Sequence, residues 1–168
     1  TSDPPSPVNG QMWYNSTERA IKGFTSNPTG TWSSGGSMNT AREKLAGNGT
    51  QTAALAIGGE IPPTLYDNTE SYNGSSWTEV ADLNTARSQL RSGGTSTSAV
   101  AFGGRTPSNT AITESWNGSA WTEVSDLNTA RQRHAGAGTD NTSAIAFAGV
   151  NPAGPPLGVT ETWNGSSW

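Results

Sequence analysis

The stretch WTEVADLNTAR (residues 77–87) decides the fold, because it returns almost unchanged as WTEVSDLNTAR (residues 121–131). The two copies differ only in having Ala81 where the other has Ser125, which indicates a recent duplication. The tryptophan that opens each copy belongs to a longer series with spacings of 45, 44 and 47 residues: Trp32, Trp77, Trp121 and Trp168. Repeats of this length are typical of solenoids and propellers.

Two further markers keep the same period. The tetrapeptide Asn-Thr-Ala-Arg ends at Arg42, Arg87 and Arg131. A short apolar run ends in a pair of small residues at Gly58-Gly59, Gly103-Gly104 and Ala148-Gly149. We therefore divide the chain into an extended arm (1–10), a β-hairpin that could be a degenerate blade (11–31), and a repeat region (32–168) with repeats 32–76, 77–120 and 121–168.

Local patterns within each repeat predict four β-strands. The apolar runs are too short for helices and predict buried strands at 53–57, 99–102 and 144–147. Alternating polar and aromatic residues predict half-exposed strands at 69–72, 113–116 and 160–163, each followed by an Asn-Gly pair, the strongest short hairpin signal. Returning strands are expected at 77–80 and 121–124, and weaker strands at 88–91 and 132–135 lead back to the apolar runs.

Variation between the repeats is concentrated in one segment of each, after the apolar strand. The segments 60–68, 105–110 and 150–158 differ in length and composition, contain proline, and are predicted to be loops. Because they occupy one topological position, we expect them to project from one face. Loops on a rigid scaffold often carry binding residues, and the candidates here are Tyr66, Asp67, Arg105, Asn109 and Asn151.

The N-terminal residues have a different pattern. Residues 1–9 are rich in proline and are expected to be extended. Residues 11–14, 15–18 and 20–24 predict a strand, a turn and a second strand.

The order of the repeat markers resembles the kelch repeat. In this order, an apolar strand ends in Gly-Gly, an aromatic residue follows about thirteen residues later, a tryptophan five residues after that, and an arginine ten further on. The first copy has Gly58, Gly59, Tyr72, Trp77 and Arg87, the second has Gly103, Gly104, Trp116, Trp121 and Arg131, and the third has Gly149, Trp163 and Trp168, with Ala148 departing from the pattern.

The resemblance implies an all-β, kelch-like β-propeller in which the aromatic residues and arginines pack between strands and blades. Closed propellers have about four to eight blades, whereas residues 32–168 supply about three repeats. We therefore expect the chain to be part of a longer polypeptide or to complete its ring by oligomerisation. A third alternative is a four-bladed ring in which residues 11–32 and the C-terminal hairpin share one blade.

Composition and charge exclude several classes of function. Nine Lys and Arg residues face thirteen Asp and Glu residues, for a net charge of −4 without a basic run, so we expect no nucleic-acid partner. No apolar stretch approaches the ~20 residues of a membrane span, so we expect no membrane insertion. The absence of cysteine excludes disulfides and thiol chemistry.

The acidic residues do not mark an active site. Glu70, Glu114 and Glu161 obey the repeat, so they are read as partners of the repeated arginines or as solvated strand residues. Kelch repeats also form galactose-oxidase-like enzymes, whose copper site needs two histidines and a cysteine-linked tyrosine. This chain has only His134, at the position of Leu45 and Leu90, and no cysteine. We therefore predict no enzymatic activity, no cofactor and no metal.

A second resemblance concerns residues 10–15, Gly-Gln-Met-Trp-Tyr-Asn. They are similar to short β segments of tail-fibre and other virion-surface proteins of tailed bacteriophages. This resemblance implies a non-enzymatic binding or structural module on a virion surface or tail fibre. Such a module would contact other virion or fibre proteins through residues 1–31 and would present variable loops for attachment or assembly, with a host-surface glycan as a candidate ligand. The alternative is a carbohydrate-binding or adhesive module of a secreted bacterial protein.

Overall fold

The computed structural model describes residues 3–6, 11–23, 33–151 and 154–168. The chain divides into two compact units, Thr1–Ser34 and Gly35–Trp168. The predicted arm and hairpin fall partly outside the described residues, and Trp32 falls wholly outside them. None of the described residues belongs to a helix long and apolar enough to cross a membrane.

The described part of the N-terminal unit is a β-hairpin of β1 (Met12–Asn15) and β2 (Ala20–Gly23), as the strand–turn–strand pattern predicts. The carboxylate of Asp3 accepts hydrogen bonds from Trp13 Nε1 at 3.0 Å and Asn15 Nδ2 at 2.5 Å. It also pairs with Lys22 Nζ at 3.0 Å. The bond from Trp13 is the main reason that the pKa of Asp3 falls to about 2. One short polar contact set therefore ties the segment before the hairpin to its strands.

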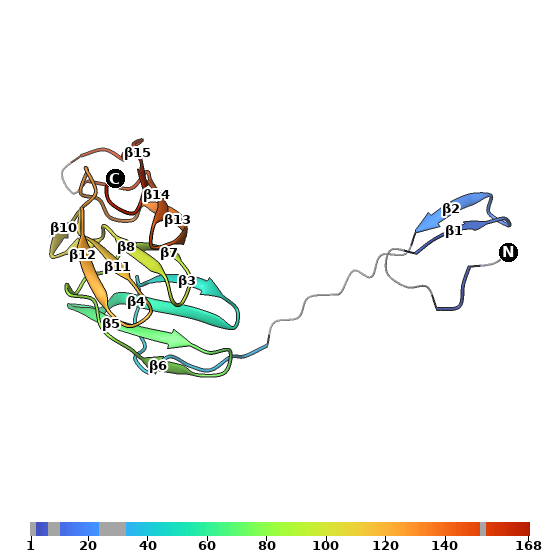
Figure 1. The fold of residues 1–168 in the computed structure, drawn as a ribbon, viewed down its shortest axis with the longest axis horizontal. Coiled ribbons are helices and arrows are strands. Elements are labelled where there is room, and N and C mark those ends of the chain that lie inside the picture. The colour runs from blue at the N-terminus through green and yellow to red at the C-terminus, as the bar shows by residue number, and fades with distance from the viewer. Residues whose placement is uncertain (1–2, 7–10, 24–32, 152–153) are drawn as a thin grey trace. The chain divides into compact units, whose positions relative to one another are not determined.

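The described residues of the second unit form three larger antiparallel sheets and one two-stranded hairpin, which confirms the predicted all-β class (Figure 1). The first sheet contains β3 (Ala46–Thr50), β4 (Ala53–Ile61), β5 (Thr64–Tyr72) and β6 (Trp77–Glu79). The second contains β7 (Arg91–Gly94), β8 (Ala99–Phe102), β11 (Thr113–Trp116) and β12 (Trp121–Val124). The third contains β13 (Ala135–Asp140), β14 (Ser143–Phe147) and β15 (Thr160–Trp163). A small hairpin of β9 (Arg105–Thr106) and β10 (Ser108–Asn109) lies between β8 and β11 in the sequence.

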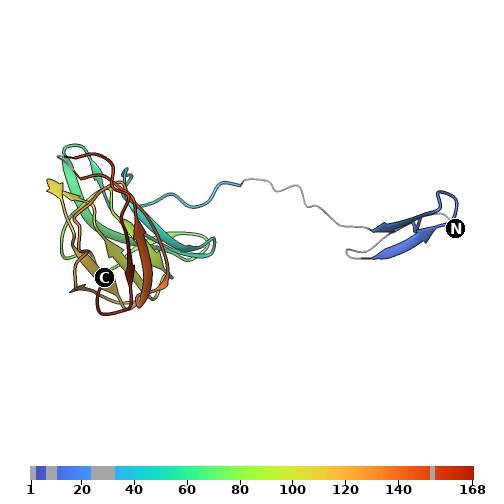
Figure 2. The same cartoon turned by 90° about the horizontal axis from the view of Figure 1, so that it is seen from above.

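Each sheet thus takes its first three strands from one sequence repeat, and the fourth strand, β6 or β12, is the segment that opens the next repeat. Neighbouring sheets pack against each other. Strand β7 contacts both β3 and β13, so the first strands of the three sheets lie side by side. Figure 2 shows the same sheets from a direction turned by 90°. Trp168 follows β15 of the third sheet and holds the position that opens the fourth strand in the other two sheets.

Two apolar cores lie between neighbouring sheets. The core between the first and second sheets contains Ala46, Leu55, Ile57, Leu83, Leu90, Ala99, Ala101, Trp116 and Trp121. The core between the second and third contains Val100, Phe102, Leu127, Ala144, Ala146 and Trp163. Successive residues of β8 therefore enter opposite cores, because side chains alternate across a strand. Burial on both faces explains why this strand is apolar at every position.

The Asn-Gly turns form where the sequence predicts them. The side-chain oxygen of Asn73 accepts hydrogen bonds from the N–H groups of Ser75 and Ser76, both at 2.9 Å. Asn117 and Asn164 make the same pair of bonds in the other repeats. The glycine that follows each asparagine has a positive φ, 93° at Gly74, which favours a residue without a side chain.

Ala148 keeps the backbone conformation of the glycines whose place it takes. Its φ is 61°, against 61° for Gly58 and 62° for Gly103. In the first two repeats, the second glycine of the Gly-Gly pair donates its N–H to the carbonyl oxygen of the arginine in the repeat that follows. Gly59, for example, donates to Arg87 O at 2.9 Å. The departure from Gly-Gly in the third repeat therefore leaves the turn's geometry intact.

Two predictions about the strands are wrong. The strands expected at 88–91 and 132–135 begin three residues later, as β7 and β13. The cause is the left-handed backbone of Gln89 (φ 57°) and Arg133 (φ 55°), which an extended strand does not contain. Their N–H groups bond to the neighbouring repeat instead, Gln89 to Lys44 O at 2.8 Å and Arg133 to Gln89 O at 3.2 Å.

The second wrong prediction is the loop at 60–68. Strand β4 continues to Ile61 and β5 begins at Thr64, so only Pro62 and Pro63 form the turn. The pairing shifts register between Ile57 and Gly59 and then continues, with Gly59 opposite Tyr66. The segment 105–110 likewise contains the β9–β10 hairpin. Proline at a turn between paired strands explains the misreading, since it resembles a loop signal in the sequence.

Candidate functional site

The repeated glutamates form buried ion pairs with the repeated arginines. Arg42 Nη1 lies 2.5 Å from Glu70 Oε1, and both side chains are fully buried. Arg87 pairs with Glu114 at 3.3 Å, and Arg131 pairs with Glu161. The sequence left two interpretations of these glutamates, as partners of the arginines or as solvated strand residues. The structure shows that they are structural partners of the arginines.

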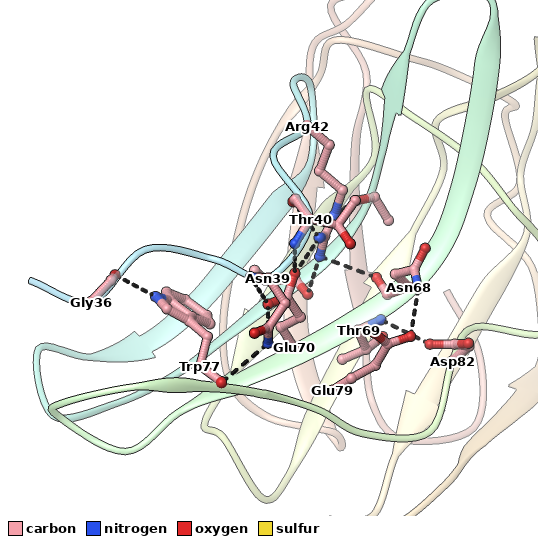
Figure 3. A network of polar contacts seen from close by, with 12 residues as sticks. Gly36, Asn39, Thr40, Arg42, Asn68, Thr69, Glu70, Trp77, Glu79 and Asp82 are labelled. Carbon is pink, nitrogen blue, oxygen red and sulfur yellow. Dashed lines mark hydrogen bonds and ion pairs between the residues drawn. The ribbon is translucent and has the colours of Figure 1, made fainter.

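An asparagine completes each of these networks, and Figure 3 shows the network around Glu70. Glu70 Oε2 accepts bonds from the backbone N–H of Asn39 at 2.7 Å and from its Nδ2 at 3.0 Å. The same Nδ2 donates to Trp77 O at 3.1 Å. Asn84 and Asn128 make equivalent bonds in the second and third repeats. The Asn-Thr-Ala-Arg tetrapeptide thus ties the link segment to the sheet that follows it in the chain.

The protonation state of Glu70 follows from these contacts. Burial alone would raise the pKa of its carboxyl. The hydrogen bond from Arg42, with those from the backbone of Asn39 and Thr40, outweighs burial and lowers the pKa. A carboxylate held in this way is charged at neutral pH and has its oxygens occupied, which suits a structural role.

The repeated tryptophans join neighbouring sheets. Trp121 Nε1 in the second sheet donates to Thr69 Oγ1 in the first, at 3.1 Å. Trp168 Nε1 donates to Thr113 Oγ1 of the second sheet at 3.0 Å. In the first sheet, Trp77 Nε1 donates to Gly36 O at 3.1 Å instead. The tryptophans therefore serve packing, and the candidate binding surface lies elsewhere.

That surface is formed by the segments that vary between repeats, which we call the variable edge (residues 60–64, 105–110 and 150–151). Each segment begins at an equivalent place, because Glu60, Arg105 and Val150 each pair with the residue that follows a repeated arginine. The structure therefore places the starts of the three variable segments at equivalent positions, as the alignment of the repeats predicts.

Contacts between repeats make the variable edge continuous. Arg105 Nη1 of the second segment lies 3.6 Å from Glu60 Oε2 of the first. Asn109 Nδ2 of the second segment donates to Val150 O of the third at 2.6 Å. The three segments thus lie next to one another, as their shared topological position predicts.

The five candidate binding residues fall into two groups. Arg105, whose side chain is 41% exposed, and the half-buried Asn109 lie on the β9–β10 hairpin and are paired across it. Asn151 is exposed and directly follows Val150. Tyr66 and Asp67 lie within β5, where their backbone carbonyls accept bonds from the N–H groups of Arg87 and Leu83. Among the described residues, no hydrogen bond or ion pair joins Tyr66 or Asp67 to Arg105 or Asn109.

Glu60 is a buried acid at this edge that sequence reasoning did not select. Its carboxylate lies 2.5 Å from Lys44 Nζ and accepts a 2.5 Å bond from Ser88 Oγ. The bond from Lys44 is the largest cause of the lowered pKa of Glu60, followed by the bond from Ser88. One signal in the sequence could have identified Glu60: the equivalent positions of the other two repeats hold Arg105 and Val150, so the residue type here does not follow the repeat.

His134 is buried, as its position in the repeat predicts. It is 1% exposed, and its ring centroid lies 5.5 Å from that of Phe102. Burial lowers its pKa to about 4, so the ring is neutral at physiological pH. Within the described ranges, no group of three His, Asp or Glu side chains is arranged to hold a metal ion. The chain matches no protein-family model, and no curated protein is similar to it at a significant level.

Proposed function

We propose that residues 35–168 form part of a kelch-like β-propeller that acts as a non-enzymatic binding and structural module. The recurring Arg–Glu–Asn network and the sheet-to-sheet tryptophans support the kelch-like interpretation, since the same contacts recur in each sheet and each sheet packs on the next. Three sheets are fewer than a closed ring contains. In this proposal further sheets complete the propeller.

The observation that carries the binding role is the continuity of the variable edge. Residues that do not vary are engaged in the structural networks, whereas the varying segments meet on one edge through the Arg105–Glu60 and Asn109–Val150 contacts. A rigid scaffold with adjacent variable segments is the arrangement that binding modules use to change ligand without changing fold.

The favoured setting is the virion surface or a tail fibre of a tailed phage. The N-terminal unit supports contacts with other virion or fibre proteins, because one face of its hairpin carries Met12 and Ile21, both 72% exposed. The opposite face carries Trp13 and Lys22, which bind Asp3. An exposed apolar face of this kind is suited to a protein neighbour.

The alternative is a carbohydrate-binding or adhesive module of a secreted bacterial protein. It is favoured by the polar character of the variable edge, where Arg105 is 41% exposed and has more N–H donors than its bond to Pro107 O and its ion pair with Glu60 use. In either setting the protein acts outside the cell, and a host-surface glycan remains a candidate ligand.

Mass spectrometry of phage particles purified on a density gradient from the source culture separates the two settings. A virion component is expected in the particle fraction in several copies per particle. Recovery of the protein only from the particle-free culture fluid would overturn the virion assignment and favour the secreted module.

The third sheet supports the proposal that this module assembles. One side of its strand β14 carries Ile145 and Phe147, and we call this side the trailing face. Phe147 is 40% exposed, whereas Phe102, its counterpart in the second sheet, is fully buried by the third sheet. Ala137 and Thr162 pair with Ile145 from either side, and the three residues line a hollow of about 430 Å³. We propose that the first sheet of a second copy covers this face.

A further inference from the structure

A cavity of about 290 Å³ lies where the three repeats meet and is lined by Lys44, Gln89, Arg91 and Arg133. Lys44, Gln89 and Arg133 hold equivalent positions, two residues after each repeated arginine. All three have a left-handed backbone, with φ of 55°, 57° and 55°. The backbone bonds from Gln89 to Lys44 and from Arg133 to Gln89 hold them next to one another. One repeated backbone feature thus brings three long polar side chains to one place.

Arg91 is the member of the cavity that breaks the repeat. Alanine holds the equivalent position in the other two repeats, as Ala46 and Ala135. The scaffold therefore does not need an arginine there. An arginine there gathers three positive side chains around one cavity, with Lys44 and Arg133 exposed and Arg91 half-buried. Like charges this close favour the binding of an opposite charge.

The charges around the cavity are not balanced by the protein. Lys44 pairs with Glu43 and Glu60, and Arg105 shares Glu60. Within the described residues, no carboxylate lies within ion-pair distance of Arg91 or Arg133. Two guanidinium groups are thus left without an anionic partner in the same cavity.

The contacts of these guanidinium groups leave donors available. Arg133 Nε donates to Gln89 Oε1 at 2.5 Å, which fixes the plane of the group. Arg91 Nη1 donates to Leu90 O at 2.9 Å. The part of the chain that the structure describes offers no acceptor to the two Nη groups of Arg133. Arginine has five donors in a fork that matches carboxylate and phosphate oxygens.

We propose that this cavity binds the acidic group of a small anionic ligand, a carboxylate or phosphate carried by a sugar-sized molecule. All four side chains that line the cavity end in polar groups, and their carbon stems form most of its exposed lining. Its volume is at the lower end of the range for small-molecule sites, about 300–1,000 Å³, so it fits one sugar-sized unit. The inference goes beyond the proposed function and holds whether or not the protein belongs to a virion.

Isothermal titration calorimetry at low salt tests this site on the whole chain, with glucuronate and glucose 6-phosphate as probes and glucose as the neutral control. Both acidic sugars are expected to bind, and glucose is not. Arg91→Ala and Arg133→Gln should each weaken binding by about tenfold or more, because a hydrogen bond to a charged group contributes about 1.5–3 kcal/mol. Both variants introduce residues that the repeat already uses at the equivalent position, so the fold is expected to persist.

Arg19→Gln is the matched control, since it removes one positive charge from the N-terminal hairpin unit. It should leave binding unchanged. Equal binding of glucose and glucuronate, or full binding by both cavity variants, would overturn the site. Inorganic phosphate is a third probe, and if it alone binds, the ligand is a free oxyanion and the assignment to an acidic sugar is wrong.

Discussion

His134 shows how one position of the repeat can accept different chemistry. Leu45 and Leu90 hold the same position in the other repeats. A Cβ added at Gly58 would lie 3.3 Å from Leu90 Cδ2, and one added at Gly103 would lie 2.6 Å from His134 Cε1. Both side chains therefore pack against the glycine turn of the preceding repeat. The imidazole differs because burial lowers its pKa, and the charges of Arg91 and Arg131 act in the same direction.

Because of His134, the free energy of unfolding is expected to change with pH up to its unfolded pKa of 6.5, which is above the pKa of ordinary carboxyl groups. Its pKa is 6.5 in the unfolded chain and about 4 in the folded one. Between these values the unfolded state binds the proton, so the free energy of unfolding falls as the pH falls. The loss at pH 5 is about 2 kcal/mol relative to pH 7.5, at about 1.4 kcal/mol per pKa unit.

Urea unfolding of the wild type and of His134→Leu at pH 7.5 and pH 5 measures this effect. The wild type is expected to lose about 2 kcal/mol, and the variant is expected to lose much less, since leucine does not titrate. Equal losses in the two proteins would show that the buried imidazole is not the group responsible.

At the scale of elements, the first strands of the sheets approach very closely. A Cβ added at Gly93 in β7 would lie 2.5 Å from the backbone nitrogen of Gly138 in β13. The absence of a side chain at Gly93 therefore sets the distance between the second and third sheets. Short, glycine-rich first strands are the consequence, and β3 and β13 also contain two glycines each.

Gly93→Ala is expected to destabilise the fold by about 1–3 kcal/mol, because the added methyl group meets backbone that cannot easily move. Gly158→Ala is the matched control, since nothing lies within 4 Å of a Cβ added there. Chemical unfolding of both variants gives the comparison. A control variant as unstable as Gly93→Ala would mean that close packing of the strands is not the cause.

The same elements show why the sequence could not place the first strands. The sequence predicts an extended strand at 88–91 because Leu90, which is buried, lies between polar residues. The left-handed backbone of Gln89 does not allow a strand at that position. Its conformation is held by a bond to Lys44, 45 residues earlier. A contact between repeats decides where the strand begins, and local propensity does not report it.

At the scale of the whole molecule, the row of sheets has an uncovered side. Between the second and third sheets, Val100 and Phe102 pack against Ala144 and Ala146. The trailing face repeats the first pair as Ile145 and Phe147, and the first sheet repeats the alanines as Ala54 and Ala56. One copy therefore carries both halves of an interface that the chain already forms internally.

Phe147→Ser is expected to reduce concentration-dependent association of the chain, raising the dissociation constant by about tenfold or more, because burying such a side chain contributes about 1.5–3 kcal/mol. Sedimentation velocity over a range of concentrations measures it. Ile61→Ser is the matched control, because Ile61 is 44% exposed on the variable edge. A wild-type chain that stays monomeric at all concentrations, or an equal effect of both variants, would contradict head-to-tail assembly.

The sequence by itself determined the period, the all-β class, the second and third strands of each sheet, and the fourth strands of the first two sheets. It could do so because alternating burial and Asn-Gly turns are local signals, read within a few residues. It also offered two interpretations of the repeated glutamates, as partners of the arginines or as solvated strand residues, and the structure shows the first. Only the tertiary structure decided where the first strands begin, that residues 60–68 are mostly strand, and that Lys44, Arg91 and Arg133 share a cavity. The second of these depends on the pairing of β4 with β5 on either side of Pro62 and Pro63. The first and the third depend on backbone bonds or packing between residues about 45 positions apart, and such contacts exist only once neighbouring repeats have been brought together.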